Sequence, residues 1–452
     1  MFPKFQSIMC AALAVAAAGC PASSEEVRPP SDQLFFPSGL GIAPDQSILF
    51  VANANSELRY DSGSVAAIDL DTVDTLIGQW LPGMQLPADP DGCPDCCEVD
   101  PDSPVTLVCN EKAMVLADTT VRLGNFAAAV GVQELASGDL RLFVPVRGDP
   151  SITYIDYSSA DRTMECGGTG SFPLCDEDHR LDHLHNNSDE LGLSEEPWGM
   201  FVDSSNGYVM ATHLTLGTVS LVDAPADGSA PMLTDAIGGL FAQNSTTGVR
   251  GATGIAGRLP GTVNDLVYVT SRAESRVHTL TVYRRANGEP TMAPGDYFFL
   301  NRVIPSSDSR GIAFSADGNR AYVVNRNPPT LQIVDTTIGP TGVPRNDMID
   351  AIEICREASV IQVADLGAGE RAYLSCFQDS QVWVLDLERR TVLATIPVGR
   401  GAHASALAAG RGRLYVTNFL EDTISVIDIQ PGSFTENRVV MQIGRERQAG
   451  GQ

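Results

Sequence analysis

Lysine is almost absent from this chain of 452 residues: only Lys4 and Lys112 occur, and the other basic residues are arginine. Acidic residues number 56 against 30 basic ones, so the formal net charge at pH 7 is −26. A surface this acidic repels phosphate backbones, which excludes nucleic acid as a partner. Aromatic residues make up only 6%, and three tryptophans are too few for the tryptophan-rich blades of quinoprotein dehydrogenases.

Several catalytic motifs are also missing. The chain has no Gly-x-Ser-x-Gly, no glycine-rich phosphate loop and no His-Glu-x-x-His, so the common serine-hydrolase, nucleotide-binding and zinc-protease classes are excluded. It has instead 42 glycines and 28 prolines, with only 19% charged residues. This composition favours many short strands joined by turns over long helices.

The N-terminus predicts a targeting segment rather than part of the fold. Residues 1–19 hold one early cation, Lys4, and an apolar run from Ile8 to Ala18 that is too short to span a bilayer. The end of this segment, "AAGC", resembles the lipobox of bacterial lipoproteins, in which the cysteine, here Cys20, is acylated and becomes the new N-terminus. Ordinary cleavage after Ala18, followed by free secretion, is the alternative.

The lipoprotein interpretation divides the chain into a signal peptide (1–19), a lipid-anchored linker (20–34), a main domain (35–444) and a short tail (445–452). Pro21 follows the cysteine, in place of the Asp that retains many Gram-negative lipoproteins at the inner membrane. The predicted location is therefore the cell envelope, at the outer membrane, with the lipid as the only membrane contact.

Cysteine parity agrees with this interpretation. Without Cys10 and a lipidated Cys20, eight cysteines remain, an even set suited to disulfides in an oxidising compartment: Cys93, Cys96, Cys97, Cys109, Cys166, Cys175, Cys355 and Cys376. We expect Cys166 to pair with Cys175 across a glycine-rich turn, and Cys355 with Cys376 on neighbouring strands. The pairing of the other four stays open, including a vicinal Cys96–Cys97 bond.

One pattern recurs through the whole chain: an apolar strand, a turn, and a second alternating strand ending in Asp. "RLYVTNFLEDTISVIDI" is its last copy, and seven copies end at Asp69, Asp156, Asp223, Val282, Asp335, Asp386 and Asp428. A further strand precedes each copy, and a fourth is predicted after several, at residues 75–81, 391–399 and 437–444. Repeated four-stranded units predict an all-β, seven-bladed β-propeller of antiparallel blades.

The amino-acid sequence of the repeat is specific enough to resemble one family. "RGIAFSADGNRAYVVN", "RLYVTNF", "ISVIDI" and "ATIPVGRG" resemble the repeat of the YVTN β-propeller family almost literally. The resemblance covers residues 35–444 and implies a seven-bladed propeller of a kind found in bacterial and archaeal envelope proteins. Most members of that family have no assigned chemistry, so the resemblance implies a fold more than a function.

Propeller ligands commonly bind at one mouth of the central channel. When the seven copies are aligned, the residue after the Asn position and the loops entering the first strands place arginines, histidines and aromatics on one face. The predicted ligand-binding residues are Arg147, His213, Arg250, Arg272, Arg310, Arg326, Phe377, Arg400, His403 and Phe419, with Arg356 and Trp198 nearby. Guanidinium groups would suit an anion, although the same arginines could pair with local acids and brace the blades.

Two insertions contain residue types that bind metals in other proteins. Residues 176–190 contain His179, His183 and His185 among six acids, a candidate divalent-metal site, although a solvated loop is the simpler interpretation. Residues 88–104 contain "CPDCC" beside an aspartate run, for which a disulfide-tied loop is favoured over thiolate zinc or calcium.

Two functional hypotheses follow. The first is a monomeric, non-catalytic binding or scaffold module of the envelope without a cofactor, which holds an envelope protein or an anionic glycan through its loop face. The second is a metal-dependent hydrolase or lactonase, or a redox-enzyme subunit, with its site at the channel mouth near His213 and His403.

Overall fold

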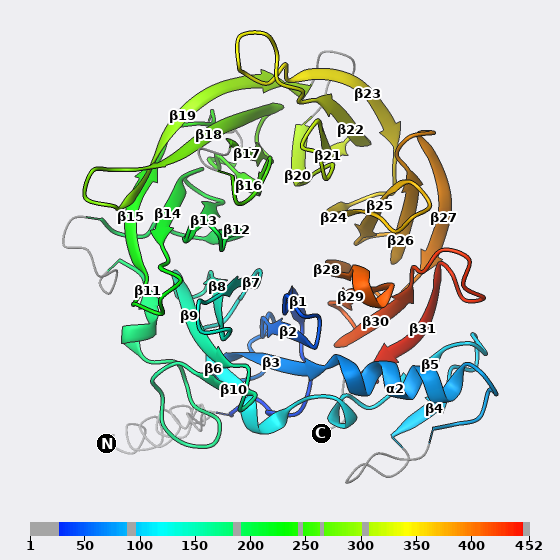
Figure 1. Ribbon diagram of the computed structural model, residues 1–452. Helices are drawn as coiled ribbons and strands as arrows, with labels where there is room; N and C mark the ends of the chain where they lie inside the picture. The colour runs from blue at the N-terminus through cyan, green and yellow to red at the C-terminus, as the bar shows by residue number, and fades with distance from the viewer. Residues whose placement is uncertain are drawn as a thin grey trace, which may run out of the picture.

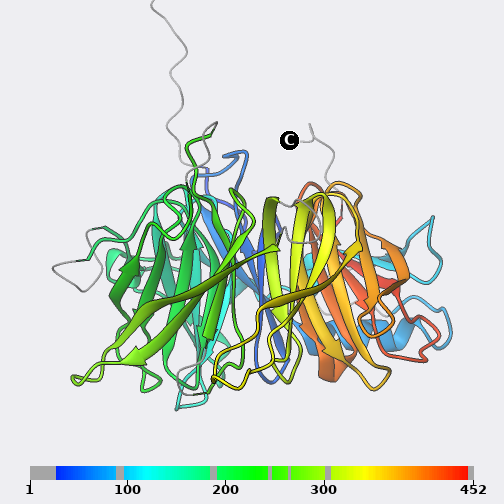
Figure 2. The same cartoon turned by 90° about the horizontal axis from the view of Figure 1, so that it is seen from above.

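The computed structural model describes residues 27–87, 96–183, 191–242, 247–262, 266–300 and 307–445. They form seven sheets arranged as blades around a central channel, so the prediction of a seven-bladed β-propeller is confirmed (Figure 1). Seen from the side, the blades stand as a ring of upright sheets of similar height (Figure 2). The signal peptide and Cys20 lie outside the described residues.

The first four blades are each built from strands that pair in chain order, from the channel outward. Blade 1 is β1 (Pro37–Ile42), β2 (Ile48–Asn53), β3 (Gly63–Asp69) and β6 (Val121–Leu123). Blade 2 is β7 (Gly131–Glu134), β8 (Leu140–Val146), β9 (Ser151–Ser158) and β10 (Thr163–Glu165), with β11 (Arg180–Leu181) also on β9. Blade 3 is β12 (Pro197–Asp203), β13 (Tyr208–His213), β14 (Val219–Asp223) and β15 (Met232–Ile237). Blade 4 is β16 (Ala252–Gly257), β17 (Leu266–Ser271), β18 (Arg276–Arg284) and β19 (Pro290–Phe299).

The last three blades follow the same order and complete the ring. Blade 5 is β20 (Ser307–Phe314), β21 (Arg320–Asn327), β22 (Pro329–Asp335) and β23 (Asp347–Glu353). Blade 6 is β24 (Ala358–Asp365), β25 (Glu370–Cys376), β26 (Gln381–Asp386) and β27 (Thr391–Pro397). Blade 7 is β28 (Ala402–Ala408), β29 (Arg413–Asn418), β30 (Thr423–Asp428) and β31 (Arg438–Ile443), extended by β5 (Leu107–Cys109) and β4 (Cys97–Val99).

The core lies between blades rather than inside any one of them. The tyrosine of the repeat is fully buried on the second strand of blades 4 to 7, at Tyr268, Tyr322, Tyr373 and Tyr415. Each apolar cluster joins side chains of two neighbouring blades; one, for example, contains Val267 of blade 4 with Met210 of blade 3. No sheet buries both faces alone, so the fold is stable only as a closed ring.

One predicted strand is wrong. Residues 75–81, expected as the fourth strand of blade 1, belong to helix α2 (Leu70–Trp80). Asp69 caps this helix by accepting hydrogen bonds from the backbone N–H groups of Asp71 and Thr72. The buried positions Val73, Leu76, Ile77 and Trp80 recur at helical spacing, which a search for strands overlooks.

The same insertion joins the two ends of the chain. After α2 it continues into β4 and β5, and β5 pairs in parallel with β31, so that Leu107 lies opposite Met441 (Figure 1). Arg411 of blade 7 also forms an ion pair with Asp71 of α2, with 2.6 Å between nitrogen and oxygen. Because β1 lies beside β28, these contacts reinforce the seam between the first and last blades.

Three disulfides are described. The pairs Cys166–Cys175 and Cys355–Cys376 are both confirmed, although Cys355 lies between β23 and β24 rather than on a strand. Cys97 pairs with Cys109, which rules out the vicinal bond between Cys96 and Cys97. Cys96 is itself disulfide-bonded, while Cys93 lies outside the described residues. None of the described helices is both long enough and apolar enough to cross a lipid bilayer.

Candidate functional site: the mouth of the central channel

Each innermost strand begins with the same local backbone conformation at the mouth of the channel. A residue with left-handed φ comes first in every blade, namely Phe36, Phe126, Glu196, Gly251, Asp308, Glu357 and Gly401, with φ between 48° and 74°. In six blades a β-bulge follows within the next few residues. A bulge redirects the side chains near it, and here it aims one side chain per blade into the channel.

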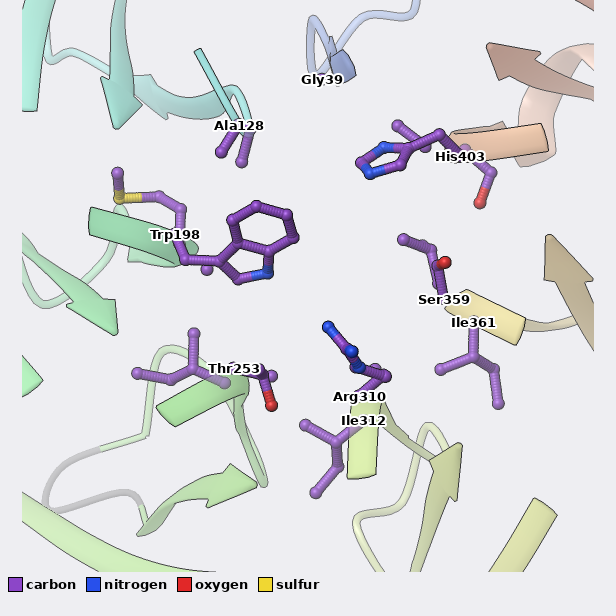
Figure 3. Close-up of a pocket in the computed structure, with 18 of the residues that line it drawn as sticks. Gly39, Ala128, Trp198, Thr253, Arg310, Ile312, Ser359, Ile361 and His403 are labelled. Carbon is purple, nitrogen blue, oxygen red and sulfur yellow. The ribbon is translucent and has the colours of Figure 1, made fainter. Parts of the chain in front are cut away.

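We call the residues two positions after the left-handed residue the mouth ring. They are Ser38, Ala128, Trp198, Thr253, Arg310, Ser359 and His403, and all seven line a cavity of about 630 Å³. Figure 3 shows Trp198, Arg310, Ser359 and His403 reaching toward one another from separate strands. A volume of this size falls in the range of small-molecule sites.

The bulge is held in place by the threonine of the repeat. Oγ1 of Thr270 accepts a hydrogen bond from the Gly254 N–H at 2.9 Å and donates to the Arg310 carbonyl of the next blade at 2.7 Å. Thr212 makes the equivalent bonds in blade 3, to the N–H of Gly199 and the carbonyl of Thr253. The threonine therefore satisfies a donor that the bulge leaves unpaired and connects adjacent blades.

Two predicted arginines, Arg310 and Arg326, lie at the cavity. Arg310 forms an ion pair with Asp308, with Nε 2.6 Å from the carboxylate oxygen, and its side chain is only 12% exposed. In the described part of the chain, its Nη1 makes no hydrogen bond. This edge of the guanidinium remains available to an anion.

Arg326 is held by blade 6. Its nitrogens donate to the carbonyl of Ala358 at 2.9 Å and to Oγ of Ser359 at 2.7 Å, and Nη1 pairs with Glu357 at 2.5 Å. Burial, together with the neighbouring charge of Arg310, lowers the pKa of Arg326 to about 10. Arg326 thus braces two blades while contributing positive charge beside the cavity.

Trp198 forms the wall opposite His403. The guanidinium carbon of Arg147 lies 5.1 Å from the centre of the Trp198 ring, and Arg147 also pairs with Glu196 at 2.7 Å. Although burial opposes it, hydrogen bonding by Thr215 and the charge of Arg147 lower the pKa of Glu196. The indole N–H has no hydrogen-bond partner among the described residues, which leaves a second donor at the mouth.

His403 supplies an acceptor. Its Nδ1 lies 3.0 Å from the Ser38 carbonyl, which only an N–H can satisfy, so the lone pair is on Nε2. Burial is the main reason that the pKa of His403 falls to about 4; the contact with Ser38 opposes this, and the charges of Arg326 and Arg310 add to it. At neutral pH the ring is therefore uncharged.

An aromatic group borders the cavity on the side of blades 6, 7 and 1. The rings of Phe377 and Phe419 lie 6.2 Å and 5.7 Å from His403, and Phe36 lies 5.5 Å from Phe419. Phe377 lines the cavity directly, whereas Phe419 stands behind His403. The mouth thus has an arginine-rich sector on blades 2 to 5 and an aromatic sector on the remaining blades.

His213 was aligned one residue out of register. It pairs with Pro197 at the start of β12, as Asn53 pairs with Pro37 in blade 1. His213 therefore occupies the Asn position itself, and Leu214 is the residue that follows it. Successive side chains on a strand point to opposite faces, so one residue of register takes the histidine away from the mouth.

The surroundings of His213 agree with a structural role. The residue is fully buried, with Nε2 2.9 Å from Oγ of Ser220 and Nδ1 3.1 Å from the Glu195 carbonyl. Burial lowers its pKa to about 4. It does not line the cavity, so the structure does not bring His213 and His403 to a common point.

The other predicted arginines stand around the mouth without entering the cavity. Arg250, Arg356 and Arg400 each directly precede the left-handed residue, three positions before the mouth ring. Arg250 donates to the Phe241 carbonyl at 2.6 Å, Arg356 pairs with Asp379 at 2.5 Å, and Arg400 pairs with Glu421 at 3.0 Å. These contacts are local to the loops at the mouth, so these three arginines neither enter the cavity nor join two blades through them.

Arg272 differs from these three. Its side chain is exposed, and its guanidinium makes no hydrogen bond or ion pair within the described part of the chain; only its backbone N–H donates, to the Gly251 carbonyl at 2.9 Å. Its charge nevertheless acts on two residues of the mouth, since it contributes to the lowered pKa values of Glu196 and Arg326. Arg272 therefore adds positive charge at the rim that no carboxylate of the described residues pairs with.

The histidine-rich insertion lies elsewhere. Nδ1 of His179 lies 2.9 Å from Asp176, and its ring packs against Tyr154 with 4.8 Å between centroids. His183 is exposed, and His185 lies outside the described residues. Among the residues that are described, no three His, Cys, Asp or Glu side chains are grouped as a metal would require.

Some cavity residues were missed from the sequence. Ser359 and Thr253 belong to the mouth ring, and Glu357 pairs with Arg326, yet none of them stood out as a candidate. The signal that could have found them is positional: the residue just before the small residue of the "RGIAF" and "ATGIAG" strands in each blade. That position is recognisable only once the blades are aligned by strand pairing.

Comparisons with known proteins support the fold alone. No family model matches the chain, and no curated protein matches it. A solved structure from Bacteroides fragilis, provisionally named a 6-phosphogluconolactonase, has a TM-score of 0.51 at 14% identity, covering 81% of this chain and 85% of that one. A protein from Bacteroides uniformis with the same provisional name has a TM-score of 0.50 at 12% identity, covering 80% of this chain and 85% of that one. The chain thus shares a seven-bladed propeller fold with these two proteins.

Proposed function

We propose that this protein is a non-catalytic binding module that captures an organic anion at the mouth of its channel. The observation that carries the proposal is the convergence on one cavity of three polar groups that have no hydrogen-bond partner among the described residues: Nη1 of Arg310, the indole N–H of Trp198 and Nε2 of His403. Two donors suit a carboxylate, and the neutral imidazole suits a hydroxyl or another donor of the same ligand.

Charge supports an anionic ligand of modest size. The chain as a whole is acidic, at −26, yet the mouth carries Arg272, Arg310 and Arg326. Asp308 and Glu357 offset two of these charges, so the cavity suits one negative group rather than a polyanion. An enclosed small molecule therefore fits this site better than an extended anionic glycan or an envelope protein, although the rim could still contact either.

The proposed setting is the cell envelope. Three described disulfides are typical of proteins kept in an oxidising compartment. We retain the YVTN family, acylation of Cys20 and outer-membrane location as parts of this proposal. Mass spectrometry of the N-terminal peptide tests the anchor: a diacyl or triacyl mass on Cys20, lost in Cys20→Ser, would support it, and an unmodified N-terminus after residue 18 would contradict it.

Hydrolysis of a lactone is the second candidate function. His403 favours it, because a neutral imidazole at a cavity, with an Nε2 that has no partner among the described residues, can act as a general base. The two propellers described above carry lactonase names, at identities of 12% and 14%. A metal-dependent form is less favoured, because His213 is remote from the cavity and no metal-ligand group occurs among the described residues.

The test is direct titration with a panel of anions. Acetate, hexanoate, benzoate, gluconate and 6-phosphogluconate would be titrated calorimetrically, with Trp198 fluorescence as a second signal. We expect at least one to bind and Arg310→Gln to weaken it about tenfold or more, because a charged hydrogen bond is lost. Arg400→Gln, on the same face but outside the cavity, is the matched control. Absence of binding, or turnover of δ-lactones that disappears in His403→Gln, would contradict the binding-module proposal.

A further inference from the structure

The cavity continues below the mouth ring into a second ring of side chains, which we call the well. Two positions further along each innermost strand, six of the seven residues are apolar: Leu40, Val130, Met200, Ile255, Ile312 and Ile361. This ring faces the channel as the mouth ring does, since the members of both rings line one cavity. All six line the same cavity as Arg310 and His403.

The chemistry of the well differs sharply from that of the mouth. Branched aliphatic side chains and a thioether surround it, and they offer no hydrogen bond to a ligand. A sugar acid or phosphosugar placed there would lose water from its hydroxyl groups without compensation. An aliphatic group would instead gain from being removed from water.

One polar residue interrupts the well. Ser405 is the seventh member, 6% exposed, and its Oγ has no hydrogen-bond partner among the described residues. Its carbonyl is already used, since it accepts from Nε2 of Gln362 at 2.8 Å. A buried hydroxyl without a partner is uncommon, so substitution of Ser405 tests which chemical group fills the well.

We infer that the ligand is an amphipathic organic anion: an aliphatic carboxylate whose head lies at Arg310 and Trp198 and whose apolar body fills the well. The inference rests on the proposed function, because it assigns a ligand class to the same site. It separates this protein from the activity in the names of its structural neighbours, since a phosphorylated sugar acid has no apolar body to place beside Ile312 and Ile361.

A chain-length series tests the inference. Linear carboxylates from acetate to decanoate would be titrated into the full propeller, beside gluconate and 6-phosphogluconate. We expect affinity to rise roughly fourfold for each added methylene until the well is filled, as burial of one CH₂ predicts. The control variants compare two positions on β24: Ile361→Thr, in the well, should reduce this increment, whereas Val363→Thr, two residues further and outside the cavity, should leave it unchanged.

Ser405→Ala locates the chain within the well. A plain alkyl chain would displace water that otherwise hydrates the Ser405 hydroxyl and would leave that hydroxyl unpaired, so removing it should tighten octanoate binding a few-fold while leaving acetate unchanged. If octanoate binding does not change, the chain does not lie beside Ser405 and the inference fails.

The other outcomes separate the two proposals. If acetate binds as tightly as octanoate, or gluconate binds more tightly than either, the mouth binds anions but the well does not select an aliphatic body. If none of these anions binds, the proposed function itself fails. A rising series that Val363→Thr abolishes as fully as Ile361→Thr would also overturn the inference, because it would place the chain outside the cavity.

Discussion

Neighbouring positions on the innermost strands serve opposite purposes. The mouth-ring position faces the channel and varies freely, from Ala128 to Trp198 to Arg310. The next position faces the adjacent blade and is small in most blades, as at Gly199 and Gly254. A Cβ on Gly254 would lie 2.0 Å from the Arg310 carbonyl oxygen.

The difference shows how a rigid backbone permits a variable site; we call the small residues and other side chains that pack between the inner strands the wall. The small residues let the inner strands approach closely, so the backbone of every blade enters the channel in the same way. With the backbone fixed, the side chain one position earlier can change without affecting blade packing. Substitutions at the two kinds of position should therefore change different properties, stability in one case and binding in the other.

The largest expected effect is on the wall. Gly254→Ala should lower the free energy of unfolding by about 3 kcal/mol, because its Cβ would meet backbone atoms of the next blade. Chemical denaturation measures this. The matched control is Gly78→Ala in helix α2, where nothing lies within 4 Å of the added Cβ and a small stabilisation is expected. Equal stabilities of the two variants would contradict the close approach of the strands.

The second prediction contrasts a wall histidine with a mouth histidine. Burial lowers the pKa of His213 from 6.5 to about 4, so the unfolded chain binds the proton more readily than the folded one. His213 therefore costs no stability above pH 6.5 and costs progressively more as the pH falls toward 4. His213→Asn, which introduces the residue of the repeat, should remove about 2 kcal/mol of the stability loss between pH 7.5 and pH 5.

Denaturation at several pH values measures this difference. His403→Asn serves as the companion variant, since the histidine it removes lies at the mouth and should change anion binding as well. Identical pH dependence of wild type and His213→Asn would show that His213 can take up a proton while folded.

The third prediction concerns the mouth. Arg310→Gln should weaken binding of a carboxylate about tenfold or more, while changing unfolding free energy by only about 1 kcal/mol, because its partner Asp308 is partly exposed. Titration of octanoate and denaturation of the same variant give both values. A variant that unfolds easily but binds normally would reverse the distinction between wall and mouth.

The smallest effect is expected at the rim. Arg400 is 59% exposed on its side chain and pairs with Glu421 outside the cavity. Arg400→Gln should change both stability and carboxylate affinity by less than about 0.5 kcal/mol, as for most exposed ion pairs. A loss of binding comparable to that of Arg310→Gln would extend the site from the cavity to the loop face.

The repeat made most of the fold predictable. The strands from Leu414 to Asn418 and from Thr423 to Asp428 are rich in apolar and β-branched residues and recur as copies of one repeat. Helix α2 was missed because "TLIGQWL" is short and apolar, and such runs suit a strand or a buried helix equally well. Pairing of β5 with β31 was also unpredictable, because the two strands are more than 300 residues apart.

The candidate site was only partly predictable. Arg310, Arg326, Phe377 and His403 were predicted at the channel and line its cavity, whereas the residue type of Ser359 and Ser405 did not mark them as candidates. The placement of His213 at the mouth was wrong for a definite reason: one position of register separates the face that lines the mouth from the face that packs between sheets. Residue type identified candidates, and strand pairing selected among them.

The amino-acid sequence by itself determined the class of fold, since seven repeats of a four-stranded unit can bury their faces only by closing into a ring. It also determined the charge balance and two of the disulfide pairs. Tertiary structure alone decided which arginines face a cavity and which brace blades, and it alone revealed an apolar well beneath a polar mouth. The physical reason is that the cavity is built from one or two residues of each of seven distant strands, whose proximity depends on ring closure and register rather than on order along the chain.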